Sequence, residues 1–141
     1  MNYLVDTHIL IWAFLALKKI SPTVLDILAD ENNLVYYSPV SLWEISIKYS
    51  VKKLTLEGYT PEEFFAELET RSYVCLPLNN LDLITNYQLP LRHKDPFDRL
   101  LIWTALRNNL TFLTVDRTAA RYYERRTAVR LVNGARPPAG V

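Results

Sequence analysis

The sequence contains little cysteine, histidine or glycine, and each shortage excludes a class of protein. One cysteine, Cys75, is too few for a disulfide framework or for a zinc site made of several thiolates. Two histidines, His8 and His93, are too few for a histidine-rich catalytic metal site. With three glycines, the chain has neither a collagen-like repeat nor a GxGxxG or GxxxxGK[ST] phosphate-binding motif.

Long hydrophobic runs are also missing. The longest uninterrupted apolar run near the start, residues 9–17, is about half of the roughly 20 residues that a membrane-spanning helix needs. The chain starts without the basic stretch of a secretory signal, and Asp6 interrupts its first apolar run. We therefore expect a soluble cytoplasmic protein.

The remaining composition fits one globular domain. The 141 residues are 50% apolar, 12% aromatic and 22% charged, which is enough apolar material for a core and argues against disorder. No internal repeat or linker is visible, so we expect one domain over residues 1–132. A tail over residues 133–141 contains two glycines and two prolines and is expected to be irregular.

The net charge of +1 hides an uneven distribution of charge along the chain. From Arg92 onward there are ten Lys or Arg and four Asp or Glu, whereas the residues before it hold six and eleven. A basic half beside an acidic one is consistent with a polyanionic partner. It is equally consistent with solvated surface charge, so alone it decides nothing.

The hydrophobic pattern alternates between short strand-like runs and helical segments. This order predicts an α/β fold with a mostly parallel sheet covered on both faces. Cys75 lies in the third predicted strand, where we expect a buried small side chain. The predicted strands are 3–5, 34–37, 73–78, 111–115 and 128–132, and the predicted helices are 7–17, 22–29, 39–49, 61–71, 79–87, 96–109 and 118–125.

Five acidic residues hold notable positions in this pattern. Asp6 and Asp116 each follow a predicted strand, while Asp95 and Asp98 lie at the start of a predicted helix. Glu44 is the only charged residue in the apolar stretch 41–47. Because sites in α/β sheets form beyond the carboxyl ends of strands, these acids could converge on one edge.

Each acid also has a purely structural interpretation. Asp6, Asp95 and Asp116 could be N-caps, and Asp98 could interact with the dipole of its helix. Glu44 is harder to explain in this way, because a glutamate on a largely buried helix needs a partner, a metal or a cleft.

Converging carboxylates would repel one another, and a divalent cation is the usual remedy. Hard oxygen ligands without thiolates or histidine pairs suit Mg²⁺ or Mn²⁺ rather than zinc. Such a centre polarises a phosphoryl oxygen and activates water for attack. The basic half could then hold the phosphates of a nucleic acid.

Four segments resemble, in order, the motifs of PIN-domain proteins, specifically the VapC-like toxins of type II toxin–antitoxin pairs. One such motif would be weak, but four in the same order through nearly the whole chain are specific. The segments are 4–12 (LVDTHILIW), 41–48 (SLWEISIK), 93–102 (HKDPFDRLLI) and 112–117 (FLTVDR).

The resemblance implies a three-layer α/β/α fold and a metal-dependent endoribonuclease that uses Mg²⁺ or Mn²⁺. By motif, Asp6, Glu44 and Asp98 match the principal acids, which are both catalytic and metal-binding, and Asp116 matches a fourth, looser ligand. Thr7 matches a hydroxyl that supports the site. Asp95 belongs to the third motif, where we expect a cap or a supporting residue.

The resemblance also implies partners, namely an RNA substrate, a cognate antitoxin protein and a second copy of the chain in a homodimer. Arg99 and Arg117 follow acids directly and are candidates for contact with the substrate. Two alternatives stay open. The chain could be a PIN-fold nuclease acting on DNA or structured nucleic acid, or a non-catalytic binding module that uses the acids as caps.

Overall fold

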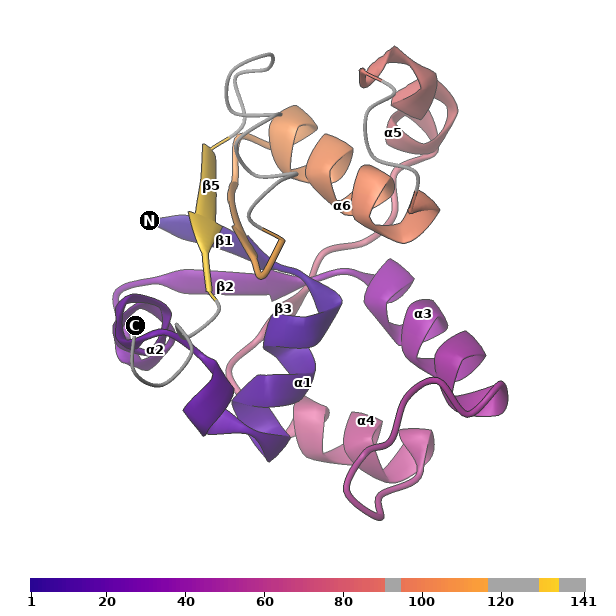
Figure 1. The fold of residues 1–141 in the computed structure, drawn as a ribbon. Coiled ribbons are helices and arrows are strands. Elements are labelled where there is room, and N and C mark those ends of the chain that lie inside the picture. Colours follow the sequence, from indigo (N-terminus) through magenta and orange to yellow (C-terminus); the bar gives the residue numbers. More distant parts are fainter. Residues whose placement is uncertain (91–94, 117–129, 135–141) are drawn as a thin grey trace.

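The computed structural model describes residues 1–90, 95–116 and 130–134, and its centre is a five-stranded sheet (Figure 1). All strand pairs are parallel, and the strand order is β3-β2-β1-β4-β5. This confirms the predicted α/β fold. The strands are β1 (Asn2–Val5), β2 (Leu34–Tyr37), β3 (Val74–Cys75), β4 (Thr111–Thr114) and β5 (Arg130–Asn133).

Six α-helices connect the described strands, and four of them begin in the same way. Ser21, Ser38, Thr60 and Asp95 each precede a proline and accept a hydrogen bond from a backbone N–H in the first turn. The helices are α1 (Thr7–Leu15), α2 (Pro22–Ala29), α3 (Pro39–Ser50), α4 (Pro61–Glu69), α5 (Asn80–Thr85) and α6 (Pro96–Arg107), with 3₁₀ turns at Leu17–Lys19 and Asn86–Gln88.

Side chains of the central strands alternate between two hydrophobic cores, one on each face of the sheet. Leu4 and Phe112 face α6, whereas Val5 and Leu113 pack with side chains of α1, α2 and α4. Figure 1 shows α6 on one side of the strands and α1 and α4 on the other. Both faces are therefore covered, as in a three-layer arrangement.

The structure differs from the sequence prediction at the edge of the sheet. The strand predicted over 73–78 is reduced to Val74–Cys75, and Cys75 is exposed, so the predicted burial of this side chain was wrong. The reason is that β3 has a neighbouring strand on one side only. The predicted helix over 118–125 and residues 135–141 of the tail lie outside the described residues.

Across residues 1–90, 95–116 and 130–134, no helix combines the length and apolar character needed to span a bilayer.

Candidate active site

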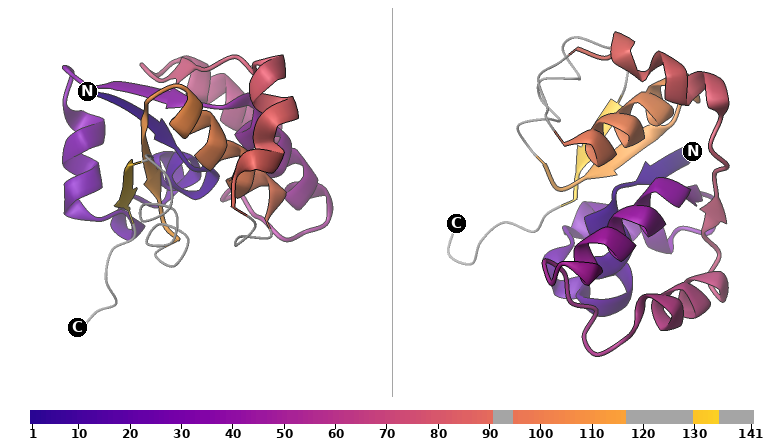
Figure 2. Two further views of the ribbon diagram at one scale, coloured as in Figure 1. Left: turned by 90° about the horizontal axis from the view of Figure 1, so that it is seen from above. Right: turned by 90° about the vertical axis from the view of Figure 1, so that its right-hand side faces the viewer.

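The carboxyl ends of β1 and β4 form the centre of the candidate site. The two strands are parallel neighbours, with Val5 opposite Leu113, and Figure 2 shows them side by side from two further directions. From β1 the chain continues to β2 on one side, whereas from β4 it continues to β5 on the other. Sites in open α/β sheets form at such a switch in strand order. Asp6 follows β1 directly, and Asp116 lies two residues beyond β4.

Asp6 links the ends of these two strands. Its Oδ1 accepts a hydrogen bond from the Ile9 N–H at 2.7 Å and caps α1, and its Oδ2 accepts one from the Val115 N–H at 2.9 Å. The structural interpretation of Asp6 as an N-cap is therefore confirmed. This does not exclude a second role, because a carboxylate oxygen has two lone-pair directions.

Burial also changes the acidity of Asp6. The residue is 3% exposed, and its desolvation raises the pKa from the ordinary 3.8 to about 6, against the opposing effect of the bonds from Ile9 and Val115. With this pKa the Asp6 carboxyl takes up a proton below about pH 6, and a bound cation would favour its ionised form.

Glu44 is held from α1 by a hydroxyl group. Helix α3 packs against α1, and the Thr7 Oγ1 donates to Glu44 Oε1 at 2.5 Å and lies 3.0 Å from Ser41 Oγ. Glu44 is only 1% exposed, so this hydrogen bond replaces water that the carboxylate has lost. Thr7 therefore fixes the position of Glu44, and its predicted role in supporting the site stays a prediction.

Lys48 is a member of the site that the sequence analysis did not identify. Its Nζ forms an ion pair with Glu44 Oε2, one turn further along α3. Desolvation lowers the pKa of Lys48, but its hydrogen bond to Glu44 and the charges of Glu44, Asp95 and Asp98 outweigh this and raise it. Lys48 thus interacts with acids of both α3 and α6. The Glu–Lys spacing of four residues was the available signal.

The acids of α6 lie in its first turn. Asp95 is the N-cap and accepts hydrogen bonds from the N–H groups of Phe97 at 2.9 Å and Asp98 at 3.4 Å, so its predicted capping role is confirmed. Asp98 is partly exposed and interacts electrostatically with Lys48. Its predicted role as a ligand stays a prediction, as does that of the partly exposed Asp116.

The structure gives little support to the two arginines that were predicted to contact substrate. Arg99 is 7% exposed, and its guanidinium donates to the carbonyl oxygens of Leu89 at 3.1 Å and Pro90 at 2.9 Å. These contacts support the chain that precedes α6 and count against a contact with substrate, which stays a prediction. Arg117 and His93 lie outside the described residues.

The carboxylates suit a hard cation by chemistry, but they are not arranged as a ready metal site. Among the described residues, no group of three His, Cys, Asp or Glu side chains is placed to hold a metal ion. The oxygens of Asp6 and Glu44 already accept hydrogen bonds from backbone amides, Thr7 and Lys48. A cation at this position would have to share these oxygens with the present donors or replace some of them.

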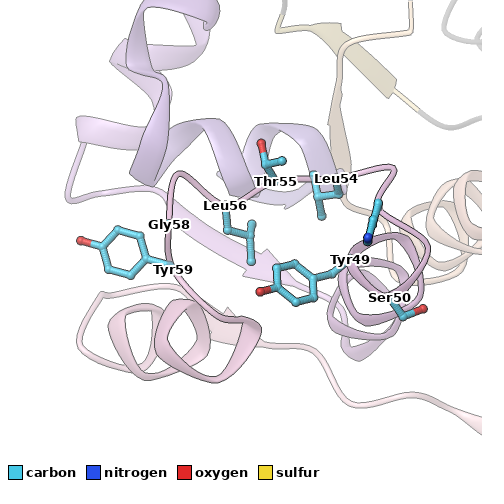
Figure 3. Close-up of a pocket in the computed structure, with 8 residues that line it drawn as sticks. Tyr49, Ser50, Leu54, Thr55, Leu56, Gly58 and Tyr59 are labelled. Carbon is cyan, nitrogen blue, oxygen red and sulfur yellow. The ribbon is translucent and has the colours of Figure 1, made fainter.

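A separate pocket of about 610 Å³ lies at the other end of α3 (Figure 3). The ring of Tyr49 and the side chain of Leu56 point toward each other between α3 and the loop that follows it. The described residues that line it include none of the four acids; they are Tyr49, Ser50, Lys52, Leu54, Thr55, Leu56, Gly58 and Tyr59. The pocket and the carboxylates are therefore distinct features.

Replacing Thr7 by valine tests the support of Glu44. We expect Thr7→Val to lower the free energy of unfolding by about 1–3 kcal/mol, because the buried Glu44 Oε1 loses its donor while the side chain keeps its shape. Urea denaturation measures the change, and Thr7→Ser, which keeps the hydroxyl, is the matched control. Equal stability of the Val and Ser variants would show that the hydroxyl contributes nothing.

Comparisons with known proteins bear on the family and the fold. A family model described as PIN domain matches residues 3–125. A crystal structure of VapBC2 from Rickettsia felis, bound to a DNA fragment from their promoter, has a TM-score of 0.65 at 20% identity, covering 95% of this chain and 99% of that chain. VapBC-1 from nontypeable Haemophilus influenzae has a TM-score of 0.63 at 16% identity, covering 94% and 98%.

A domain of a functionally unknown protein from Methanocaldococcus jannaschii is also similar, with a TM-score of 0.60 at 14% identity over 99% of this chain and 95% of that chain. No curated protein sequence matches the chain. At these identities, the solved structures show a likeness of fold alone.

Proposed function

This chain belongs to the PIN-domain family, and from that membership we propose that it is a metal-dependent endoribonuclease acting as the toxin of a toxin–antitoxin pair. One observation carries the proposal. Asp6 and Asp116 follow the adjacent strands β1 and β4, while α3 and α6 supply Glu44 and Asp98, whose charges are linked through Lys48. These are the four acids that the family motifs single out.

The proposed reaction is hydrolysis of an RNA phosphodiester. A divalent cation such as Mg²⁺ or Mn²⁺ would polarise a phosphoryl oxygen and lower the pKa of water at the scissile bond. In this proposal Asp6, Glu44 and Asp98 provide the carboxylates and Asp116 a looser one. Thr7 keeps Glu44 oriented, and Asp95 shapes the start of α6.

Substrate and partners are part of the same proposal. Arg117, and Arg99 with less support, are the candidates for contact with RNA phosphates. Two of the similar structures are VapBC proteins, which favours a cognate antitoxin protein as partner. A homodimer is proposed on the family resemblance alone.

Cleavage assays with three substrates test the function. We expect the full chain to cleave single-stranded or looped RNA when Mn²⁺ or Mg²⁺ is present and to lose this activity in EDTA, because the carboxylates alone do not polarise the phosphate. The products should carry 5′-phosphate and 3′-hydroxyl ends. Gel analysis of a transfer RNA, a ribosomal RNA fragment and a single-stranded DNA measures both activity and substrate class.

The alternatives predict different results in the same assay. Cleavage of the DNA at a rate equal to that of the RNA would favour a nuclease with another substrate, because phosphate contacts carry little information about the target. Failure to cleave any substrate, together with an unfolding temperature that Mn²⁺ leaves unchanged, would favour a non-catalytic binding module.

A further inference from the structure

The carboxylate of Glu44 is paired with a positively charged side chain of the same protein, the ammonium group of Lys48. Thr7 occupies Oε1, and the Lys48 ammonium occupies Oε2. The side chain of Glu44 is 2% exposed, whereas that of Lys48 is 30% exposed. The acid is thus buried, while the base that neutralises it reaches the protein surface.

This ion pair differs from an ordinary surface pair in the same molecule. Glu67 in the last turn of α4 and Arg71, two residues beyond its end, have the same spacing of four residues, but their side chains are 51% and 48% exposed. Such exposed pairs contribute little, because water and salt screen them. The Lys48–Glu44 pair has a buried acid, and the charges of Asp95 and Asp98 also act on Lys48.

Lys48 is placed to offset the negative charges of three acids, Glu44, Asp95 and Asp98. Carboxylates that share a site repel one another unless a positive charge lies between them. Lys48 supplies this charge to Glu44 directly and to Asp95 and Asp98 through space. The stem of Lys48 is long and flexible and its side chain is 30% exposed, so the ammonium group has solvent to move into when it leaves Glu44.

We propose that the Lys48 ammonium takes the place of a divalent cation at Glu44, so that a metal ion and Lys48 compete for the same carboxylate oxygen. The inference rests on the proposed function, since it assumes that the site receives such an ion. It assigns Lys48 as a positioning residue, which holds Glu44 in place until the ion binds. The competition also explains why a carboxylate that is chemically suited to Mg²⁺ or Mn²⁺ forms an ion pair with a lysine in this structure.

Calorimetric titration of the full chain with Mn²⁺ tests the competition. We expect Lys48→Met to bind Mn²⁺ at least about tenfold more tightly than the wild type. In this variant the ion does not have to displace the Lys48 ammonium from Glu44, and no positive charge beside the site repels it. Lys48→Arg keeps the charge and should bind Mn²⁺ less tightly than Lys48→Met. Arg71→Met removes the base of the exposed pair with Glu67 and should leave the affinity unchanged.

The rise in unfolding temperature caused by Mn²⁺ supplies a second measurement, which a merely structural role of Lys48 would leave unchanged. In EDTA, Lys48→Met should unfold at a lower temperature than the wild type, because Glu44 loses its counter-ion. Saturating Mn²⁺ should raise its unfolding temperature by more than it raises that of the wild type. A purely structural Lys48 would lower both temperatures equally.

The outcomes separate this inference from the function on which it rests. Wild type and Lys48→Met with equal Mn²⁺ affinity, or a variant that binds more weakly, would overturn the competition and leave the metal-dependent nuclease standing. Failure of every variant and of the wild type to bind Mn²⁺ would overturn the proposed function and the competition with it.

Discussion

Asp98→Asn is expected to reduce metal-stimulated RNA cleavage by about a thousandfold or more, which corresponds to about 4 kcal/mol of transition-state stabilisation. Asp98 lies in the first turn of α6 and is partly exposed, so replacing its carboxylate by an amide of the same shape leaves the packing of the helix intact. The change removes a single negative charge, which belongs to a proposed ligand and also acts on Lys48. Single-turnover cleavage of an RNA substrate in Mn²⁺ measures the loss.

The control for Asp98 must separate a missing ligand from a weakened helix. Glu63 is the third residue of α4, as Asp98 is the third residue of α6. The substitution Glu63→Gln therefore removes a comparable favourable interaction with a helix dipole, but on a helix that carries none of the proposed ligands. Both variants should stay folded, and only Asp98→Asn should lose cleavage. Full cleavage by folded Asp98→Asn would remove this residue from the site.

The stability of the metal-free protein is expected to fall as the pH rises from about 4 to about 6, by about 3 kcal/mol from Asp6 alone. Burial raises the pKa of Asp6 from 3.8 to about 6, so across this interval the folded chain holds a proton that the unfolded chain has lost. The stabilisation is complete below the unfolded pKa and is lost as the pH passes the folded value. Urea unfolding in EDTA at a series of pH values measures it.

The variant Asp6→Asn identifies the group responsible. It has no ionisable side chain at this position, so its stability should lack this part of the pH dependence, although it also loses an acceptor for one of the two backbone N–H groups. Identical pH dependence in the two proteins would mean that another group is the one that titrates.

Cleavage should depend on pH in the opposite direction. A cation binds the ionised carboxylate, so the rate at limiting Mn²⁺ should fall by about tenfold for each pH unit below about 6. Activity and metal-free stability should therefore have opposite slopes over the same interval. A rate that stays level down to about pH 4 would contradict a requirement for ionised Asp6.

Features that depend on neighbouring residues could be predicted from the sequence. The helices predicted to begin at residues 22, 39, 61 and 96 do begin there, because the cap and the first turn of each are formed by neighbouring residues. The alternation of strands and helices likewise predicted the parallel sheet. The positions of Asp6 and Asp116 after their strands followed from the same pattern.

Features that depend on distant contacts could not be predicted. The exposure of Cys75 depends on which strand lies at the edge of the sheet, and the burial of Arg99 depends on the carbonyl groups of Leu89 and Pro90. The pairing of Lys48 with Glu44 follows a local spacing. Its importance, however, comes from the burial of Glu44 and from Asp95 and Asp98, which lie about fifty residues further along the chain.

The hydrogen bond from Val115 to Asp6 has a consequence for protein synthesis. It joins residues 109 positions apart, so the chain must close a very long loop before Asp6 has both of its partners. A nascent chain that has not yet emerged as far as β4 therefore leaves the Asp6 carboxylate without the Val115 N–H. On the proposed function, such a chain also lacks Asp116 and Asp98 or their final positions, so the nuclease cannot act before its last ligand-bearing strand has joined the sheet.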